Sequence, residues 1–430
     1  MTSPAGVHAL VRRTHEDRVL HVLREHGALT RAELADRIGL SRTTLSEITA
    51  SLLSRGLIAV DRSAAPIAGR GRPAQTLRLD PVAGLYLGVD FRHRAVQVVI
   101  ANAAREIIAS DGLAYSDPAE ASDQRPDWVQ RSRVAFDLID RMATAGGVHL
   151  RGVLGIAVGL PGPFPPRIPR PHDAPIAEAR RELADTVRSE FAQRFGIDVV
   201  LDNNTRLAAL AEAAWRPSEA VADLLYVRLS DGVGGGLVVD GRLVAGSTGF
   251  AGELGHLRVA GADGECRCGK RGCLETVASI HAVLVACAQA GVAVESLDEV
   301  ESAAAKGDPS VLAVLRAVGS AVGQVLGSLA VALNPREIVI GGEVALASDV
   351  LIDQIVETVT YELLPVGRYG PRIRRTSLRH EAGAIGGIIA LLRRTPVLAG
   401  YPTLTDPALP EGRTPREKMN APLAPTGGSR

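Results

Sequence analysis

The first 80 residues contain three segments in which apolar side chains recur at helical spacing. His15 to His26 forms the first. Thr30 and Glu33 then have the T-x-x-E spacing of a capping box, which predicts the start of a second helix. Gly39 is expected to end that helix, and Ser41 to cap a third. The predicted inward positions of the three helices are Val19, Leu23, Leu34, Ile38, Leu45, Ile48 and Leu52.

Two short β-type segments follow the third helix. Leu57–Val60 and Gln75–Leu79 flank a loop rich in glycine, arginine and proline, Ala68–Pro73. Three helices followed by a β-hairpin make a winged helix-turn-helix, whose third helix enters the DNA major groove. We therefore expect a DNA-binding domain over residues 1–80.

From Gly84 onward, short apolar strands alternate with helical stretches, which is the pattern of an α/β domain. We expect this domain to cover residues 84–394, and the Pro-, Thr- and Gly-rich tail, residues 395–430, to be disordered. The predicted strands are Leu85–Val89, Ala95–Ile100, Gly155–Val158, Val199–Leu201, Leu224–Leu229, Leu237–Val239 and Glu337–Ile340.

Charge is unevenly distributed although the whole chain is neutral. The 430 residues include 48 basic and 48 acidic side chains, yet residues 1–80 contain twelve Arg against eight Asp and Glu. This local excess of positive charge favours nucleic-acid binding by the N-terminal segment. Hydrophobic residues make up 46% and charged residues 22%, a composition that excludes a largely disordered chain.

The outward face of the third helix offers hydrogen-bonding groups without bulk. Arg42, near its start, is best placed for a guanine edge or a phosphate. In the loop, Arg70-Gly71-Arg72-Pro73 resembles the core of an AT-hook, so Arg70 and Arg72 are expected in a narrow minor groove. The alternatives are a protein-docking module and a solvated loop. The predicted contacts from the helix are Ser41, Arg42, Thr43, Thr44 and Ser46, with Thr49 also expected to face outward.

Three of the four cysteines lie within eight residues, after a histidine. His256, Cys266, Cys268 and Cys273 have the spacing H-x9-C-x-C-x4-C, and these four donors suffice for a tetrahedral Zn²⁺ shell. Such a shell has no open position, so we expect a structural ion in the loop 256–273. The alternative is three reduced cysteines beside an unrelated histidine. Cys287 lies in an apolar helical run and is expected in the core.

No export signal is evident at the N-terminus, and the clustered cysteines favour a metal over disulfides, so a cytoplasmic location is expected. The longest uncharged stretch, Ala317–Pro335, is predicted to be a buried core helix rather than a membrane span. Gly319, Gly323 and Gly327 recur every four residues and would give it one flat face for close packing.

Several motifs together resemble the ROK family of repressors, open reading frames and sugar kinases. They are Gly159–Pro163, Asp231–Gly236, Gly252–His256, the cysteine loop and Glu275. The resemblance spans roughly residues 5–395. It implies two α/β lobes of the actin-like, hexokinase type with a sugar between them. Members with an N-terminal winged helix are usually sugar-responsive transcription regulators.

The resemblance also implies roles for individual residues. Glu253, His256 and Glu275 match family residues that bind sugar hydroxyls, and the family histidine also ligates the zinc. Asn203 and Asn204 lie where the family has an Asn-Asp pair. Carboxylates and amides suit the vicinal hydroxyls of a sugar. The alternative for either glutamate is a solvated surface carboxylate.

The sequence departs from the family's kinases at three places. Arg92, His93 and Arg94 follow Asp90-Phe91 where kinases have the glycines and threonine of D-x-G-G-T. Asn204 replaces the catalytic aspartate, the general base whose loss alone costs about 10²–10⁴-fold in rate. Asp231 replaces a threonine beside the nucleotide phosphates. We therefore assign no catalytic residue.

Three hypotheses follow. The first is a DNA-binding regulator, most simply a repressor, that binds operator DNA as a homodimer or dimer of dimers and responds to a sugar or sugar phosphate. The second is an active ATP-dependent sugar kinase fused to a regulatory domain. The third is a zinc-bearing DNA-binding protein that has lost its ligand. No membrane partner is expected.

Overall fold

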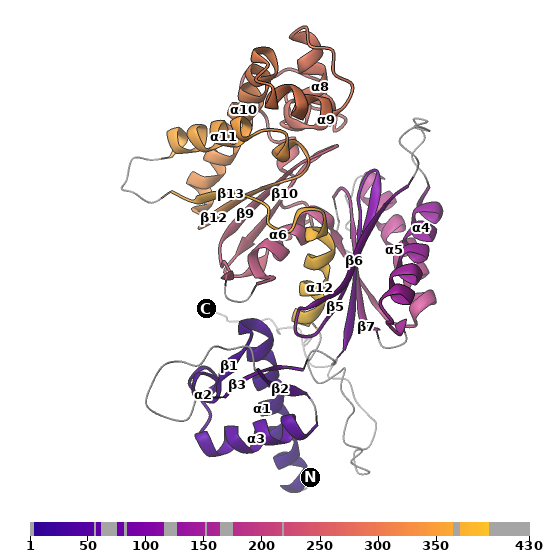
Figure 1. Cartoon of the computed structure of the whole chain (residues 1–430), viewed down its shortest axis with the longest axis vertical. Coiled ribbons are helices and arrows are strands. Elements are labelled where there is room, and N and C mark those ends of the chain that lie inside the picture. The colour runs from indigo at the N-terminus through magenta and orange to yellow at the C-terminus, as the bar shows by residue number, and fades with distance from the viewer. Residues whose placement is uncertain are drawn as a thin grey trace, which may run out of the picture.

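A computed structural model describes residues 4–55, 57–61, 75–80, 84–115, 127–150, 153–163, 175–216, 219–363 and 370–394 (Figure 1). The predictions for Arg70, Arg72 and the tail, residues 395–430, fall outside the described residues.

The N-terminal unit contains the three predicted helices and the hairpin. The capping box between Thr30 and Glu33 is present, Gly39 ends the second helix with φ +72°, and the Ser41 side chain caps the third. The first helix begins at Pro4, earlier than predicted, and a short strand precedes the second helix. The elements are α1 (Pro4–His26), β1 (Leu29–Thr30), α2 (Arg31–Ile38), α3 (Arg42–Ser54), β2 (Ile58–Asp61) and β3 (Thr76–Leu79), and the sheet order is β1-β3-β2.

One residue of α3 was wrongly predicted to face outward. Thr49 is fully buried, because it lies four residues after Leu45 and therefore on the same inner face of the helix. Its hydroxyl donates to the Ser46 carbonyl oxygen and accepts from Arg31. Thr49 is thus part of the core of the unit and is removed from the candidate DNA contacts.

Lobe 1 follows the N-terminal unit and is built on a five-stranded sheet. The order is β6-β5-β4-β7-β8, with β4, β5 and β6 antiparallel and β4, β7 and β8 parallel. Helices α4 and α5 cover one face (Figure 1). Strand β6, which is mostly exposed, was not predicted. The elements are β4 (Leu85–Phe91), β5 (Ala95–Asn102), β6 (Ile107–Ala114), α4 (Trp128–Ala145), β7 (Val153–Leu160), α5 (Pro175–Phe195) and β8 (Val199–Asn203).

Lobe 2 repeats the same topology with different strands. Its order is β11-β10-β9-β12-β13, again three antiparallel strands beside two parallel neighbours. Strand β10 begins at Val233, four residues earlier than predicted, and includes Gly234–Gly236, because glycines give a weak strand signal. The strands are β9 (Leu224–Leu229), β10 (Val233–Val239), β11 (Arg242–Leu243), β12 (Glu337–Gly341) and β13 (Arg372–Arg375).

The helices of lobe 2 pack around an apolar cluster that includes the buried Cys287, as predicted. The predicted flat face is also present. A Cβ atom on Gly319, Gly323 or Gly327 would lie within 2.9 Å of a side chain on the neighbouring helix. The helices are α7 (Glu275–Ala278), α8 (Ile280–Gln289), α9 (Leu297–Ala305), α10 (Pro309–Leu333) and α11 (Asp349–Glu362).

Helix α10 is, among the described residues, the one helix long and apolar enough to span a membrane. In its most apolar 18-residue window, 61% of the residues are buried inside the protein. This burial agrees with the predicted core helix.

Two further helices, α6 (Asn204–Ala214) and α12 (Ala382–Arg394), lie between the two sheets (Figure 1). They touch closely, since a Cβ atom on Gly386 would lie 1.7 Å from the Leu207 carbonyl oxygen. Their buried side chains form one apolar cluster with residues of β4 and β9, including Tyr86 and Tyr226. The two lobes therefore share a central layer.

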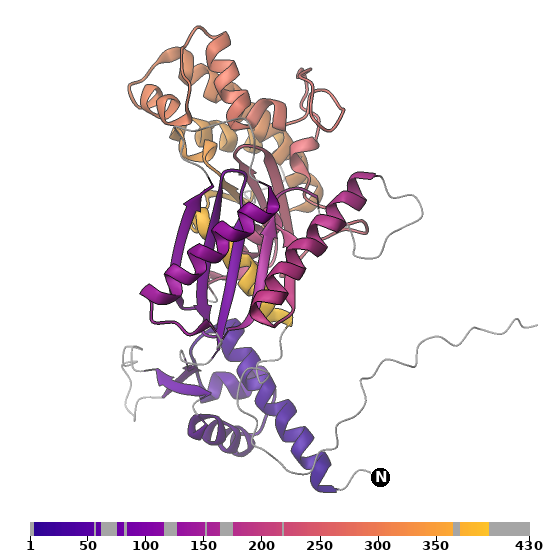
Figure 2. The same cartoon turned by 90° about the vertical axis from the view of Figure 1, so that its right-hand side faces the viewer.

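The N-terminal unit contacts lobe 1 at the turn between β5 and β6 (Figure 2). Ala104 packs against the apolar core of the N-terminal unit, and Arg78 of β3 forms an ion pair with Glu106 at 2.8 Å. At the end of α1, Glu25 lies near Arg393 of α12, and this arginine contributes to lowering the pKa of Glu25 after the hydrogen bond from His21. Helix α12 thus reaches from the lobe interface to the N-terminal unit.

Candidate functional site

The N-terminal end of α3 presents exposed polar side chains. Arg42, Thr43 and Ser46 are exposed. Ser41 and Thr44 are partly engaged with each other, because Ser41 Oγ accepts from the Thr44 amide at 3.1 Å and lies 2.8 Å from Thr44 Oγ1. Arg42 is therefore the charged group of this set that is available to an incoming phosphate or base.

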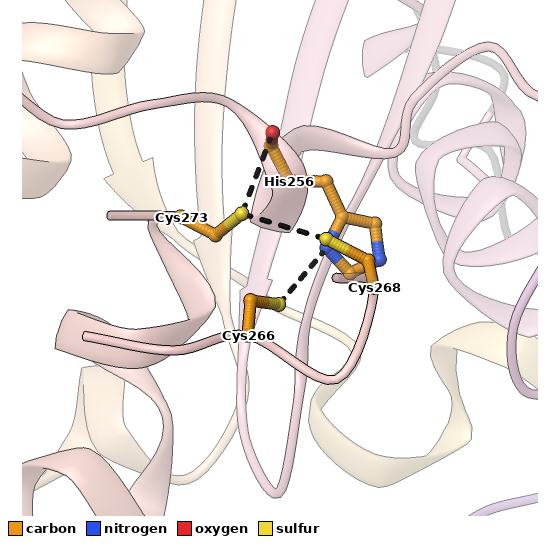
Figure 3. Close-up of side chains that lie close together, drawn as sticks. All are labelled: His256, Cys266, Cys268 and Cys273. Carbon is orange, nitrogen blue, oxygen red and sulfur yellow. Dashed lines mark hydrogen bonds between the residues drawn. The ribbon is translucent and has the colours of Figure 1, made fainter. Parts of the chain in front are cut away.

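The four predicted metal ligands meet in one loop of lobe 2. Their ligand atoms all lie within 4.8 Å of one another (Figure 3). The Cys266 sulfur lies 3.6 Å from His256 Nδ1, and the sulfurs of Cys268 and Cys273 are 3.7 Å apart. Turns at Gly269 and Gly272, with φ +85° and +74°, fold the loop back so that residues distant in sequence meet.

The spacing of these atoms fits a tetrahedral ion. Metal–sulfur bonds of about 2.3 Å and metal–nitrogen bonds of about 2.0–2.1 Å place two ligand sulfurs about 3.8 Å apart, and a sulfur and a nitrogen about 3.6 Å apart. The donor set, three thiols and one imidazole, is one that zinc prefers. Because Nδ1 of His256 faces the sulfurs, Nε2 is left to face another group.

Glu275 and Glu253 lie on either side of His256 in sequence. Glu275 is buried, and its Oε2 accepts from the Val233 amide and from Arg267, both at 3.1 Å. Glu253 is half-buried, and this burial raises the pKa of its carboxyl. Glu275 and Arg267 also line a cavity of about 660 Å³ bordered by α8 and α10.

The two asparagines lie at the start of α6 and are already bonded. Asn203 accepts from the amides of Thr205 and Arg206 as the N-cap, and its Nδ2 donates to the Gly162 carbonyl oxygen at 2.6 Å. Asn204 donates to the Phe91 carbonyl oxygen at 3.1 Å and ties α6 to the end of β4. Both amides therefore hold the loops at this end of lobe 1.

Three arginines of this region were missed by sequence reasoning. Arg206 of α6 pairs with Asp202 and donates to the Gly249 carbonyl oxygen of lobe 2 at 2.7 Å. Arg267 pairs with Glu275 at 2.9 Å, and Arg180 of α5 donates to the Pro161 carbonyl oxygen at 2.9 Å. All three act electrostatically on Glu253. The sequence offered a signal for Arg267 alone, because its position between Cys266 and Cys268 places it in the metal loop.

The lobes are also joined by ion pairs where the kinase pattern fails. Arg92 pairs with Glu343, which follows β12, and Arg94 pairs with Asp231 at 3.0 Å. Asp90, fully buried in β4, lies 3.6 Å from Arg228 of β9. Each pair joins one residue of lobe 1 to one residue of lobe 2.

Little space remains around these pairs. Arg92 also lies 2.9 Å from His380 Nδ1, and burial lowers the pKa of both side chains. The pocket that Arg92 and Arg228 line has a volume of about 10 Å³, close to the minimum for one water molecule. This end of the interface is filled by the protein's own side chains.

The ROK family model matches residues 86–394, which covers both lobes, the cysteine loop and α12. The chain belongs to the ROK family. A second model, that of the MarR family, matches residues 8–66, so the ROK member carries an N-terminal winged helix of MarR type. The predicted fold class is confirmed by both matches.

Relatives of two kinds resemble this ROK chain. The xylose repressor of Caldicellulosiruptor bescii is 25% identical over 400 residues, covering 90% of this chain and 97% of the repressor. The glucokinase of Halalkalibacterium halodurans is 30% identical over 323 residues, covering 70% of this chain and 93% of the kinase. The repressor match includes nearly the whole chain, whereas the kinase match leaves almost a third of it unpaired.

The fold is also similar to a solved one. A ROK-family transcriptional regulator, described as a homologue of the E. coli Mlc protein, superposes with a TM-score of 0.68. It is 24% identical, and the match covers 91% of this chain and 98% of that one. The arrangement of winged helix and two lobes is therefore shared with that protein.

Proposed function

We propose that this ROK protein is a sugar-responsive transcription regulator, most simply a repressor, that binds operator DNA through α3. One observation supports this above the others. The chain combines an exposed Arg42-bearing helix end with a lobe interface whose nucleotide end is filled by ion pairs. A regulator needs the first feature, and a kinase cannot use the second.

We propose a structural zinc ion bound by His256, Cys266, Cys268 and Cys273. The ion would fix the loop and the orientation of the His256 ring, whose Nε2 would then be free for a sugar hydroxyl. Glu253, Glu275, Asn203 and Asn204 complete the proposed sugar site. Asn203 has one remaining amide hydrogen, and Glu253 has no direct hydrogen bond among the described residues, so these two side chains have the spare bonding capacity.

Sugar binding would reach the DNA-binding unit through the central helices. Helix α6 begins at Asn203 and Asn204 and packs along α12, whose Arg393 lies near Glu25 of α1. A ligand that favours one spacing of the lobes would shift the position of α12, and the shift in operator affinity is limited by its differential affinity for the two spacings.

The DNA-binding step is tested by selecting binding sequences from a random double-stranded library with the full chain. We expect an inverted repeat, because two-fold pairing doubles the base contacts of one winged helix. Arg42→Ala should weaken binding by about 1–3 kcal/mol if the contact is bidentate. Arg216→Ala, which removes one exposed arginine just after α6, is the matched control.

The sugar response is tested on the selected operator with a panel of free and phosphorylated sugars. Glu253→Ala should bind the operator normally and lose the response. Glu265→Ala removes an exposed carboxylate from the same loop region and should keep it. A normal response from Glu253→Ala would refute the assigned site, and selection of no DNA sequence would refute the regulator itself.

A further inference from the structure

Arg180 of α5 lies beside the Pro161–Gly162 loop of lobe 1, at the edge of the proposed sugar site. Its Nη1 donates to the Pro161 carbonyl oxygen, and the Gly162 carbonyl oxygen next along accepts from Asn203. A Cβ atom on Gly162, where φ is +87°, would lie 2.6 Å from Arg180 Nη2. The guanidinium therefore rests directly on this loop, in space that only glycine leaves open.

The other two arginines of the region are neutralised by acidic partners. Arg206 pairs with Asp202, and Arg267 pairs with Glu275 through Nε at 2.9 Å and Nη2 at 3.1 Å. Arg180 forms no ion pair with any described residue. Glu253 acts on it electrostatically without forming an ion pair with it. Among the described residues, the site thus contains one cation that has no carboxylate partner.

An unpaired cation in a partly buried position is unfavourable unless an anion completes it. Arg180 is partly buried, and this burial together with the charge of Arg267 lowers the pKa of its guanidinium. The hydrogen bond to the Pro161 carbonyl oxygen uses one of the five N–H donors of the Arg180 guanidinium, so the planar group keeps donors for a second acceptor. Phosphate and carboxylate groups match that fork with two parallel hydrogen bonds.

We propose that the effector is an anionic sugar, a sugar phosphate or a sugar acid, whose charged group binds Arg180. This inference rests on the proposed function, because it takes Glu253, Glu275 and Asn203 as the groups that bind the sugar hydroxyls. The anionic group would lie at the Pro161–Gly162 loop, away from the ion pair between Arg92 and Glu343. Arg180 would then determine specificity.

Isothermal titration of the full zinc-bearing chain tests this. The probes are glucose, glucose 6-phosphate, glucuronate, N-acetylglucosamine and N-acetylglucosamine 6-phosphate, with inorganic phosphate as the anion without a sugar. We expect at least one anionic sugar to bind about tenfold or more tightly than its neutral parent, as a charge-assisted bidentate contact should give. The phosphate ester and the carboxylate probes distinguish the two sources of charge.

Arg180→Gln should reduce that preference to about threefold or less while the affinity for the neutral parent stays within about twofold. Arg188→Gln, on the same helix and paired with Asp185, should keep the preference. Tighter binding of neutral sugars by the wild type, or an unchanged preference in Arg180→Gln, would overturn the inference and leave the proposed function standing. Failure of every sugar to bind would overturn both.

Discussion

The two lobes have the same strand topology, but their corresponding loops have different chemistry. The hairpin turn after β4 contains Arg92 and Arg94, whereas the one after β9 contains Asp231 and Gly232. The second strand of lobe 1, β5, is lined with buried valines, while its counterpart β10 has three consecutive glycines, Gly234–Gly236. The same strand topology thus carries positive charge and bulky side chains in lobe 1, and negative charge and small residues in lobe 2.

These differences are complementary across the interface. The arginines of lobe 1 meet Asp231 and Glu343 of lobe 2. The glycines of β10 admit α6, since a Cβ atom on Gly236 would lie 2.5 Å from the Ala209 side chain. The glycine-rich run is therefore explained by helix packing and gives no support to nucleotide binding.

The largest effect is expected from the metal loop, which has no counterpart in lobe 1. Cys268→Ser should reduce bound zinc from about one ion per chain to near zero, since three ligands hold Zn²⁺ far less firmly than four. The melting temperature should fall, and sugar binding should weaken because His256 is no longer oriented. Elemental analysis and thermal unfolding measure this.

Cys287→Ala is the matched control for the metal loop. It removes the one cysteine outside the metal cluster, a residue of α8 that is buried in the apolar core of lobe 2, and should leave the zinc content unchanged. Wild-type protein purified without chelators that contains no zinc would refute the metal assignment.

A smaller effect is expected where β10 meets α6. Gly236→Val should destabilise the protein by about 1–3 kcal/mol or more, because the added atoms collide with Ala209 and with the Arg206 backbone 3.1 Å away. Val239→Ile, at an exposed position of the same strand, should change stability little. Urea unfolding measures both, and equal stability of the two variants would contradict the packing explanation.

The ion pairs between the lobes should contribute less. A double-mutant cycle of Arg92→Ala and Glu343→Ala should show a coupling of about 1 kcal/mol, reduced by added salt, because both side chains are partly exposed. The same cycle at Arg94 and Asp231 should give less than about 0.5 kcal/mol, because Arg94 is 83% exposed. Equal couplings at the two pairs would show that burial does not decide their strength.

The smallest effect is expected when the catalytic aspartate of the family's kinases is restored, because no kinase activity should be gained. Asn204→Asp should not release ADP from ATP with common hexoses, because the ion pairs still fill the nucleotide end. The new carboxylate would also face the Phe91 carbonyl oxygen, which the amide now bonds. A coupled ADP assay with an active family kinase as control measures this, and turnover comparable to that control in the wild type would favour the kinase alternative.

Local features of this fold could be predicted from the sequence. The capping box at Thr30, the turn at Gly39 and the glycine face of α10 depend on residues a few positions apart. The convergence of His256 with the three cysteines follows from glycine turns within an 18-residue segment. In each case the residues that form the feature are close in sequence, so their spacing alone was informative.

Contacts between distant segments could not be predicted in this way. Arg180 meets Gly162 from a separate helix, and Arg92 meets Glu343 from the other lobe. Edge strands were also missed, because β6 is mostly exposed and β13 is three-quarters arginine, so neither shows a buried apolar pattern. Thr49 was misplaced because its polar type outweighed its helical position.

The location of α12 has a consequence for synthesis on the ribosome. Its residues are the last of the described chain to be made, yet they cover β4, the first strand of lobe 1, so closely that a Cβ atom on Gly88 would lie 2.1 Å from the Ala384 carbonyl oxygen. About 300 residues lie between these two segments in the chain. The ribosome adds about 5–20 residues per second, so β4 emerges well before α12. The apolar face of β4 and β7 stays uncovered until α12 has been synthesised. A nascent chain halted before Ala382 should therefore need chaperone protection, although its N-terminal unit is complete.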